Sequence, residues 1–333
     1  MGAAVLLFQL AVWLPLHARR SDADWMDFSV YRRAAQHVAA GEPLYAECAA
    51  FRLGAPPSCF YYPPVLAVAL APLASLEAPT FQLVWYVGIL AAFWLFALGL
   101  VRLAGSRTTA LHVLGAGALL QLTPGMTTTM SFGNAELWVW ALCALALGDL
   151  GRRPLLAVAA CLKIYPGWAI AVALFRRDER RRAWVTVGLA AALIALAAAV
   201  VGVGAFRDWT AALGVMASGL RTGTNVSLPV AALRVAGRLG FSGGGAVFLV
   251  AAPLLGVPWV AFATRAWPFE RSAAVVLVAS ALLAPLCWLH YAPILLSPAA
   301  AWLRGRVRPP LVHRPRAQVP VAADDDAAVD GDR

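Results

Sequence analysis

Charged residues are scarce in this sequence of 333 residues, and lysine is nearly missing from it. Charged side chains make up 13% of the chain, whereas a soluble globular protein has about 25%. Hydrophobic side chains make up 61%, and only one of the 27 lysines and arginines, Lys163, is a lysine. The composition therefore excludes an ordinary soluble domain and predicts an integral membrane protein.

Few polar residues interrupt the ten long apolar stretches of the sequence. These stretches are 2–18, 61–76, 79–103, 109–123, 135–150, 154–176, 183–205, 243–265, 272–287 and 290–303. A transmembrane helix needs about 20 predominantly apolar residues, and several stretches reach that length. We therefore expect an all-α, polytopic integral membrane protein with about 10–12 transmembrane helices over residues 1–303.

The arginines cluster between the apolar stretches. Such clusters are typical of cytoplasmic loops, so the net charge of +10 does not indicate a nucleic-acid partner. The loops 19–60 and 206–241 then fall on the outer face of the membrane, and so does the shorter loop 123–134. Residues 304–333, first rich in proline and arginine and then acidic, are predicted to form a disordered cytoplasmic tail.

Arginine pairs flank both ends of the stretch 154–176, so both ends are expected on the cytoplasmic side. The stretch must then be a hairpin of two short helices that turns near Pro166, which places Lys163 near the outer face. The same charge rule requires a partial or re-entrant helix over 61–76. In the loop 19–60, "MDFSVYRRAAQHVAAG" has helical spacing of its apolar residues and predicts an amphipathic surface helix. "NVSLPVAALRVAGRLG" predicts a similar helix in the loop 206–241.

The five cysteines have no metal-binding spacing. Two of them, Cys48 and Cys59, share the loop 19–60. They can form a disulfide if that loop faces an oxidising compartment.

Polar residues that are expensive in a membrane gather at the predicted outer ends of several helices. They are Asp22, Asp24, Asp27, Asn134, Glu136, Lys163, Arg221, Asn225, Arg234 and His290. A purely structural protein has little reason to direct so many polar groups at one face, so we expect a functional site there.

Each prominent polar residue has two possible interpretations. Asp27 either caps the surface helix or acts as a general base, with Asp22 and Asp24 as alternatives in the same loop. Lys163 either extends its ammonium to the membrane interface or meets a phosphate. His290 is either a hydrogen-bonded interfacial histidine or a group that binds phosphate or handles a proton.

The aromatic run "FYYPP", which contains Tyr62, has two readings as well. It either belongs to the aromatic belt at the membrane interface, or it lines an apolar groove and stacks on a sugar.

Six segments together resemble a known family. They are "DFSVYRRAAQHVAAGEPLY", "FYYPPVLAVALAPLASL", "SFGNAE", "AACLKIYPGW", "NVSLPVAALR" and "APLCWLHYAPI". In this order, over about residues 20–300, they resemble glycosyltransferase family 87, the polyprenyl-phosphate-mannose-dependent α-mannosyltransferases of bacterial cell envelopes. The turn at 133–136 departs from the family pattern G-Q-x-N, and Tyr291 stands where the family has a second histidine.

The resemblance implies a GT-C fold and transfer of a sugar, with inversion, from a polyprenyl phosphate to a glycolipid or lipoglycan at the periplasmic face of the plasma membrane. It implies no cofactor, because a lipid monophosphate leaves without an obligatory metal. In the roles it implies, Asp27 is the base and His290 a second catalytic group. The residues it implies for substrate binding are Lys163, Arg234, Asn225, Ser227, Asn134, Tyr62, Asp22 and Asp24.

A polytopic transporter or lipid flippase is the alternative function. Such proteins usually have paired internal repeats and polar residues near the middle of the membrane. This sequence has no convincing repeat, and its polar residues lie at one face. A sugar transferase is therefore the preferred interpretation.

Overall fold

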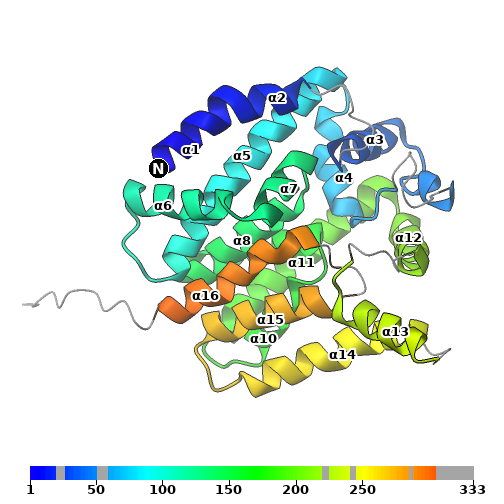
Figure 1. Ribbon diagram of the computed structural model, residues 1–333. Coiled ribbons are helices and arrows are strands. Elements are labelled where there is room, and N and C mark those ends of the chain that lie inside the picture. The colour runs from blue at the N-terminus through cyan, green and yellow to red at the C-terminus, as the bar shows by residue number, and fades with distance from the viewer. Residues whose placement is uncertain are drawn as a thin grey trace, which may run out of the picture.

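A computed structural model describes residues 1–19, 27–50, 59–219, 225–240, 245–284, 287 and 289–304. Within these ranges every regular element is a helix (Figure 1), so the prediction of an all-α fold is confirmed. The predicted tail lies outside the described residues apart from Arg304.

Two helices, α5 (Ala78–Leu103) and α11 (Arg180–Val201), are long and apolar enough to cross a membrane. They indicate a membrane protein. In the described part of the chain, most of the other predicted stretches form shorter helices, because prolines and glycines interrupt them. Full-length spans are therefore fewer in this structure than the 10–12 that the apolar stretches predict.

The remaining helices have the following bounds. They are α1 (Gly2–Phe8), α2 (Leu14–Ala18), α3 (Asp27–Ala40), α4 (Pro64–Leu70), α6 (Ala110–Gln121), α7 (Pro124–Phe132), α8 (Glu136–Gly148), α9 (Leu155–Leu162), α10 (Gly167–Leu174), α12 (Gly204–Gly219), α13 (Leu228–Arg238), α14 (Gly245–Ala263), α15 (Phe269–Leu283) and α16 (Leu296–Leu303). A π-helical segment, η1 (Gln9–Trp13), joins α1 to α2. Short 3₁₀ helices are η3 (Ala46–Ala50), η4 (Ala71–Leu73), η5 (Leu150–Arg152) and η6 (Leu289–Leu295).

The core forms where α5 packs along α8. Small residues allow this close approach: a Cβ atom added to Gly99 of α5 would lie 2.7 Å from the Cβ of Ala144 in α8. Large side chains such as Phe93, Phe96 and Trp140 fill the remaining space and are buried. The helices α2 and α16 pack against α5, and α15 packs against α8 (Figure 1).

The stretch 154–176 forms two short helices, α9 and α10, as predicted. The chain leaves α9 at Lys163, whose backbone is extended, and re-enters a helix after Pro166. The stretch 61–76 forms only the short helix α4 and the 3₁₀ turn η4, which agrees with the expected partial helix.

The predicted amphipathic helix in the first loop is α3, and it ends at Gly41 as expected. One face of α3 is buried, with Phe28, Tyr31 and Ala35 inside the protein. The helix packs against α4, η4 and α5. Its apolar face therefore contacts protein.

The segment 123–134 was expected to be a loop, and this prediction was wrong. Residues Pro124–Phe132 form α7, which begins with proline in its first turn and ends at Gly133 in the left-handed conformation (φ 65°). Three consecutive threonines at 127–129 hide the helix in the sequence, because β-branched polar residues have low helix propensity. Packing of α7 against η6 and α6 stabilises it instead. The second large loop also holds α12, besides the predicted α13.

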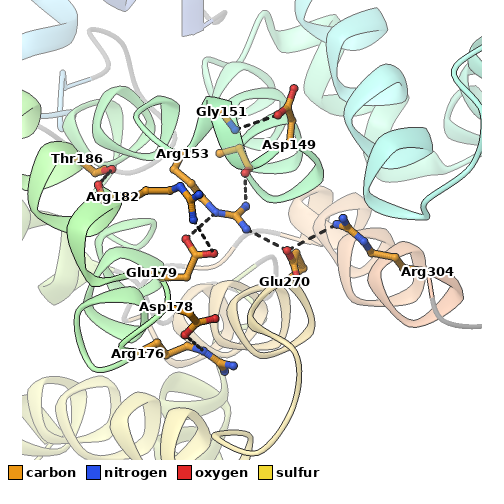
Figure 2. Close-up of polar contacts among 11 residues, drawn as sticks. Asp149, Gly151, Arg153, Arg176, Asp178, Glu179, Arg182, Thr186, Glu270 and Arg304 are labelled. Carbon is orange, nitrogen blue, oxygen red and sulfur yellow. Dashed lines mark hydrogen bonds and ion pairs between the residues drawn. The ribbon is translucent and has the colours of Figure 1, made fainter. Parts of the chain in front are cut away.

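A buried ionic cluster around Arg153, which lies between α8 and α9, joins α8 to Glu179 before α11, to Glu270 of α15 and to Arg304 after α16 (Figure 2). The Arg153 guanidinium donates from Nε to Glu179 (3.3 Å), from Nη2 to Glu270 (3.0 Å) and from Nη1 to the carbonyl of Ala146. Its side chain is 3% exposed. Arg304 in turn lies 3.7 Å from Glu270.

Candidate functional site

A hydrogen-bonded chain of side chains begins at Asp27, the first residue of α3. The amide of Asn134 donates to the Asp27 carboxylate (2.5 Å), and the Tyr62 hydroxyl donates to the Asn134 carbonyl oxygen (3.1 Å). The Tyr31 hydroxyl donates to that of Tyr62 (3.0 Å) and accepts the backbone N–H of Ala135 (3.1 Å). Three predicted site residues from distant parts of the sequence thus meet directly.

The loop that carries Tyr62 is fixed on two sides. A disulfide joins Cys48 to Cys59, with Cα atoms 4.7 Å apart; the sequence had left this pair open. The Tyr45 hydroxyl donates to the Tyr62 carbonyl at 2.7 Å. These contacts hold the start of α4 beside α3.

The pKa of Asp27 is raised from 3.8 to about 6. Burial of the carboxylate raises the pKa, and the positive charge of Lys163 and the hydrogen bond from Asn134 offset part of this increase. A carboxylate with a pKa near neutrality is suited to accept a proton under physiological conditions.

Glu136 begins α8 and is fully buried. Its carboxylate accepts hydrogen bonds from the Lys163 ammonium, the Tyr165 hydroxyl and the indole of Trp140 (3.0 Å). Its backbone N–H donates to the side-chain oxygen of Asn134 at 2.8 Å. The turn 134–136 therefore connects the carboxylate of Asp27 to the ammonium of Lys163.

Lys163 lies at the break between α9 and α10, and its side chain is 17% exposed. The ammonium pairs with Glu136 and also donates to the Tyr291 hydroxyl. It lies 4.2 Å from the centre of the Tyr291 ring and 5.3 Å from that of Tyr62. These contacts point it into the protein and do not leave it as a simple interfacial anchor.

A cavity of about 450 Å³ opens beside this cluster. Lys163, Tyr62 and Tyr291 line one part of it. The apolar wall consists of Tyr61, Pro63, Ile164, Trp168, Trp209, Leu213, Pro253, Leu254, Ala281 and Ala284. An apolar cavity with a few convergent polar groups is the usual form of a ligand site.

Asn225 and Ser227 lie just before α13 and are buried. The Asn225 side-chain oxygen accepts the backbone N–H groups of Ser227 and Cys287, both at 3.1 Å. Asn225 thereby joins this segment to the segment after α15. In the described part of the chain, Ser227 Oγ and the Nη2 atom of Arg234 are buried without a hydrogen-bond partner, and neither residue lines the cavity.

Four residues of the predicted site have no described side chain. Asp22 and Asp24 lie outside the described residues, and so does Arg221. His290 belongs to η6, but its side chain is outside the described part.

Glu136 is the residue whose role the sequence left unassigned. The sequence places it among the outer polar residues without naming a partner. The signal was an acid and the lysine of the chain in neighbouring membrane-like stretches, because buried charges of opposite sign usually pair. In the described ranges, no group of three or more histidine, cysteine or acidic residues could hold a metal ion.

Comparison with known proteins gives one match. The model of glycosyltransferase family 87 matches residues 60–298, which is well over half of the chain. Neither a curated protein nor a solved structure matches. The matched range contains the turn at 134–136 and Lys163, whereas Asp27 precedes it.

Proposed function

Because the chain belongs to glycosyltransferase family 87, we propose that it moves a mannosyl or related residue from a polyprenyl-phosphate sugar to a glycolipid or lipoglycan of the cell envelope. As a glycosyltransferase, it has a sugar donor and an acceptor as substrates. The main support is the joining of the Asp27 carboxylate and the Lys163 ammonium through one turn beside an apolar cavity. No finding supports the transporter alternative.

In this proposal the donor occupies the cavity. Its apolar wall suits an isoprenoid chain, and the Lys163 ammonium with the Tyr291 hydroxyl suits the phosphate. As the bond between the sugar and the phosphate breaks, negative charge grows on the phosphate. A fixed cation there stabilises the transition state more than the ground state.

The acceptor approaches the opposite face of the sugar ring. The Asp27 carboxylate takes the proton of the acceptor hydroxyl while the hydroxyl oxygen bonds to the anomeric carbon and the phosphate leaves. This single displacement inverts the anomeric centre. Asn134 orients the base by its hydrogen bond.

The remaining predicted residues have proposed roles around this reaction. Tyr62, which lines the cavity, binds a sugar hydroxyl. Asn225, Ser227 and Arg234 do not line the cavity, so their proposed part is indirect: Asn225 and Ser227 fix the segment before α13, and the charge of Arg234 acts on the donor from a distance. His290 handles a proton or contacts the phosphate, and Asp22 and Asp24 assist the base.

We place the site on the outer, periplasmic side of the plasma membrane. The disulfide between Cys48 and Cys59 supports this orientation, because disulfides persist mainly in oxidising compartments.

The proposal is tested by incubating membranes that contain the protein with labelled polyprenyl-phosphate sugars and cell-envelope glycolipids. Mass spectrometry should find an acceptor heavier by one sugar residue. If no donor of this class yields a product, while the protein is folded and inserted, the proposed donor is wrong.

The pH dependence of transfer should follow the ionisation of Asp27. Since a base must be deprotonated to act, and the pKa is about 6, kcat/KM should fall about tenfold per pH unit below pH 6 and level off above it. Initial rates from pH 4.5 to 8 give the profile. A rate that stays constant down to pH 4.5 would contradict a base with this pKa.

The role of Lys163 can be separated from its pairing with Glu136. Lys163→Met alone would leave a buried carboxylate unpaired, so the double variant Glu136→Gln/Lys163→Met is the sharper test. We expect it to fold and to lose about 100-fold in kcat/KM for the donor, through loss of the cation at the phosphate. Unchanged donor kinetics would show that Lys163 serves only as the counter-ion of Glu136.

A further inference from the structure

The segment before α11 contains more positive charge than its neighbours neutralise. Residues 175–184 read FRRDERRRAW. Arg176 pairs with Asp178 at 3.7 Å, and Arg182 pairs with Glu179 at 3.8 Å. Figure 2 shows that Glu179 also faces Arg153, so both acids of the segment are already engaged.

Three arginines of this segment have no acidic partner in the described part of the chain: Arg177, Arg180 and Arg181. All three are exposed, and with Trp184 and Val185 they line one open depression, which we call the arginine depression. Trp184 is 59% exposed. An exposed aromatic side chain beside exposed arginines is typical of the membrane interface.

The helix that follows faces outward. Only 11% of the most apolar window of α11 is buried inside the protein, compared with 61% for α5. An apolar helix with this little burial marks a contact with membrane or protein, and the exposed arginines and Trp184 at its start favour the membrane. The arginine depression therefore lies where α11 leaves the apolar phase of the membrane.

This depression is separate from the candidate active site. Glu179, next to Arg180, pairs with Arg153 before the first residue of α9, whereas Lys163 follows the last residue of that helix. The two sites thus lie toward opposite ends of α9.

We propose that the arginine depression binds the phosphate headgroups of anionic phospholipids. Guanidinium groups match phosphate oxygens with paired hydrogen bonds. Three unneutralised arginines attract a lipid with net negative charge more strongly than a zwitterionic lipid, whose net charge is zero. The exposed Trp184 ring contacts the glycerol and upper acyl region of the same lipid. This inference does not depend on the transferred sugar.

The test uses the full-length protein in neutral detergent, titrated with phosphatidylglycerol or phosphatidylcholine and followed by native mass spectrometry. Wild-type protein should retain phosphatidylglycerol in preference to phosphatidylcholine. Because each basic residue near an anionic membrane contributes measurably, Arg177→Gln/Arg180→Gln/Arg181→Gln should weaken phosphatidylglycerol binding about 100-fold. The matched control removes three other exposed arginines: Arg107→Gln/Arg207→Gln/Arg238→Gln.

Equal binding of the two lipids, or equal loss in the test and control variants, would overturn the proposal. An additional arm adds inorganic phosphate at millimolar concentration. If phosphate displaces the lipid completely, the depression is a general anion site and the lipid assignment is wrong. Retention of the lipid in the presence of phosphate supports the lipid assignment.

Discussion

Asp27→Asn is expected to lower kcat for sugar transfer by about 1,000-fold with little change in stability, because general-base catalysis contributes in this range. The asparagine side chain keeps the size of aspartate, and its carbonyl oxygen can still accept the hydrogen bond from Asn134. It cannot take a proton from the acceptor. Transfer of labelled sugar by reconstituted protein measures the loss.

The control for this variant is Asp178→Asn, which removes a carboxylate that is 70% exposed and pairs with Arg176 in the segment before α11. It should leave the rate unchanged. Full activity of Asp27→Asn in well-folded protein would assign the base to another residue, and Asp22 and Asp24 would be the next to replace.

Arg153→Met is expected to lower the free energy of unfolding by about 3–5 kcal/mol. The change leaves two carboxylates, of Glu179 and Glu270, without their shared cation, and their side chains are only 5% and 15% exposed. Arg182 and Arg304 remain 3.8 and 3.7 Å from these carboxylates, but both are exposed to solvent and compensate only in part. Removing one partner of a buried ion pair destabilises a protein far more than replacing the whole group. Denaturant unfolding in mixed micelles measures the difference.

Two further variants test this explanation. Arg182→Gln removes an ion pair with the same Glu179, but the arginine is 48% exposed, so the loss should stay below about 1 kcal/mol. The triple variant Arg153→Met/Glu179→Gln/Glu270→Gln should recover much of the stability. A loss in Arg153→Met no larger than that in Arg182→Gln would mean that the cluster contributes little.

The helices were predictable where one local signal decided them. Apolar composition marks α5 and α11, and charge at both ends of 154–176 together with Pro166 predicts the break between α9 and α10. Residues 124–132 have only boundary signals, Pro124 and Gly133, while their threonines favour a loop, so packing against η6 and α6 decides that they are helical. The length of each helix likewise depends on tertiary contacts.

The site was predictable in part, from polar side chains in apolar surroundings. Asp27, Asn134, Tyr62 and Lys163 were selected in this way, and the structure brings them together. Opposite charges in neighbouring apolar stretches suggest a link between Lys163 and Glu136 but do not fix it, because the contact depends on how α8 and α9 pack. The positions of Asn225 and Arg234 relative to the cavity depend on packing in the same way.

The turn that ends α7 has a consequence for how such enzymes diversify. Gly133 adopts its left-handed conformation there, and Trp85 donates to its carbonyl at 2.7 Å, so the turn is rigid. Asn134 and Glu136, two residues apart on this turn, contact Asp27 and Lys163, so the turn limits the separation of the proposed base and the proposed cation. Under the proposed function, substitutions in α12 and α14 can therefore reshape the cavity for different substrates over evolution while Asp27 and Lys163 keep their spacing.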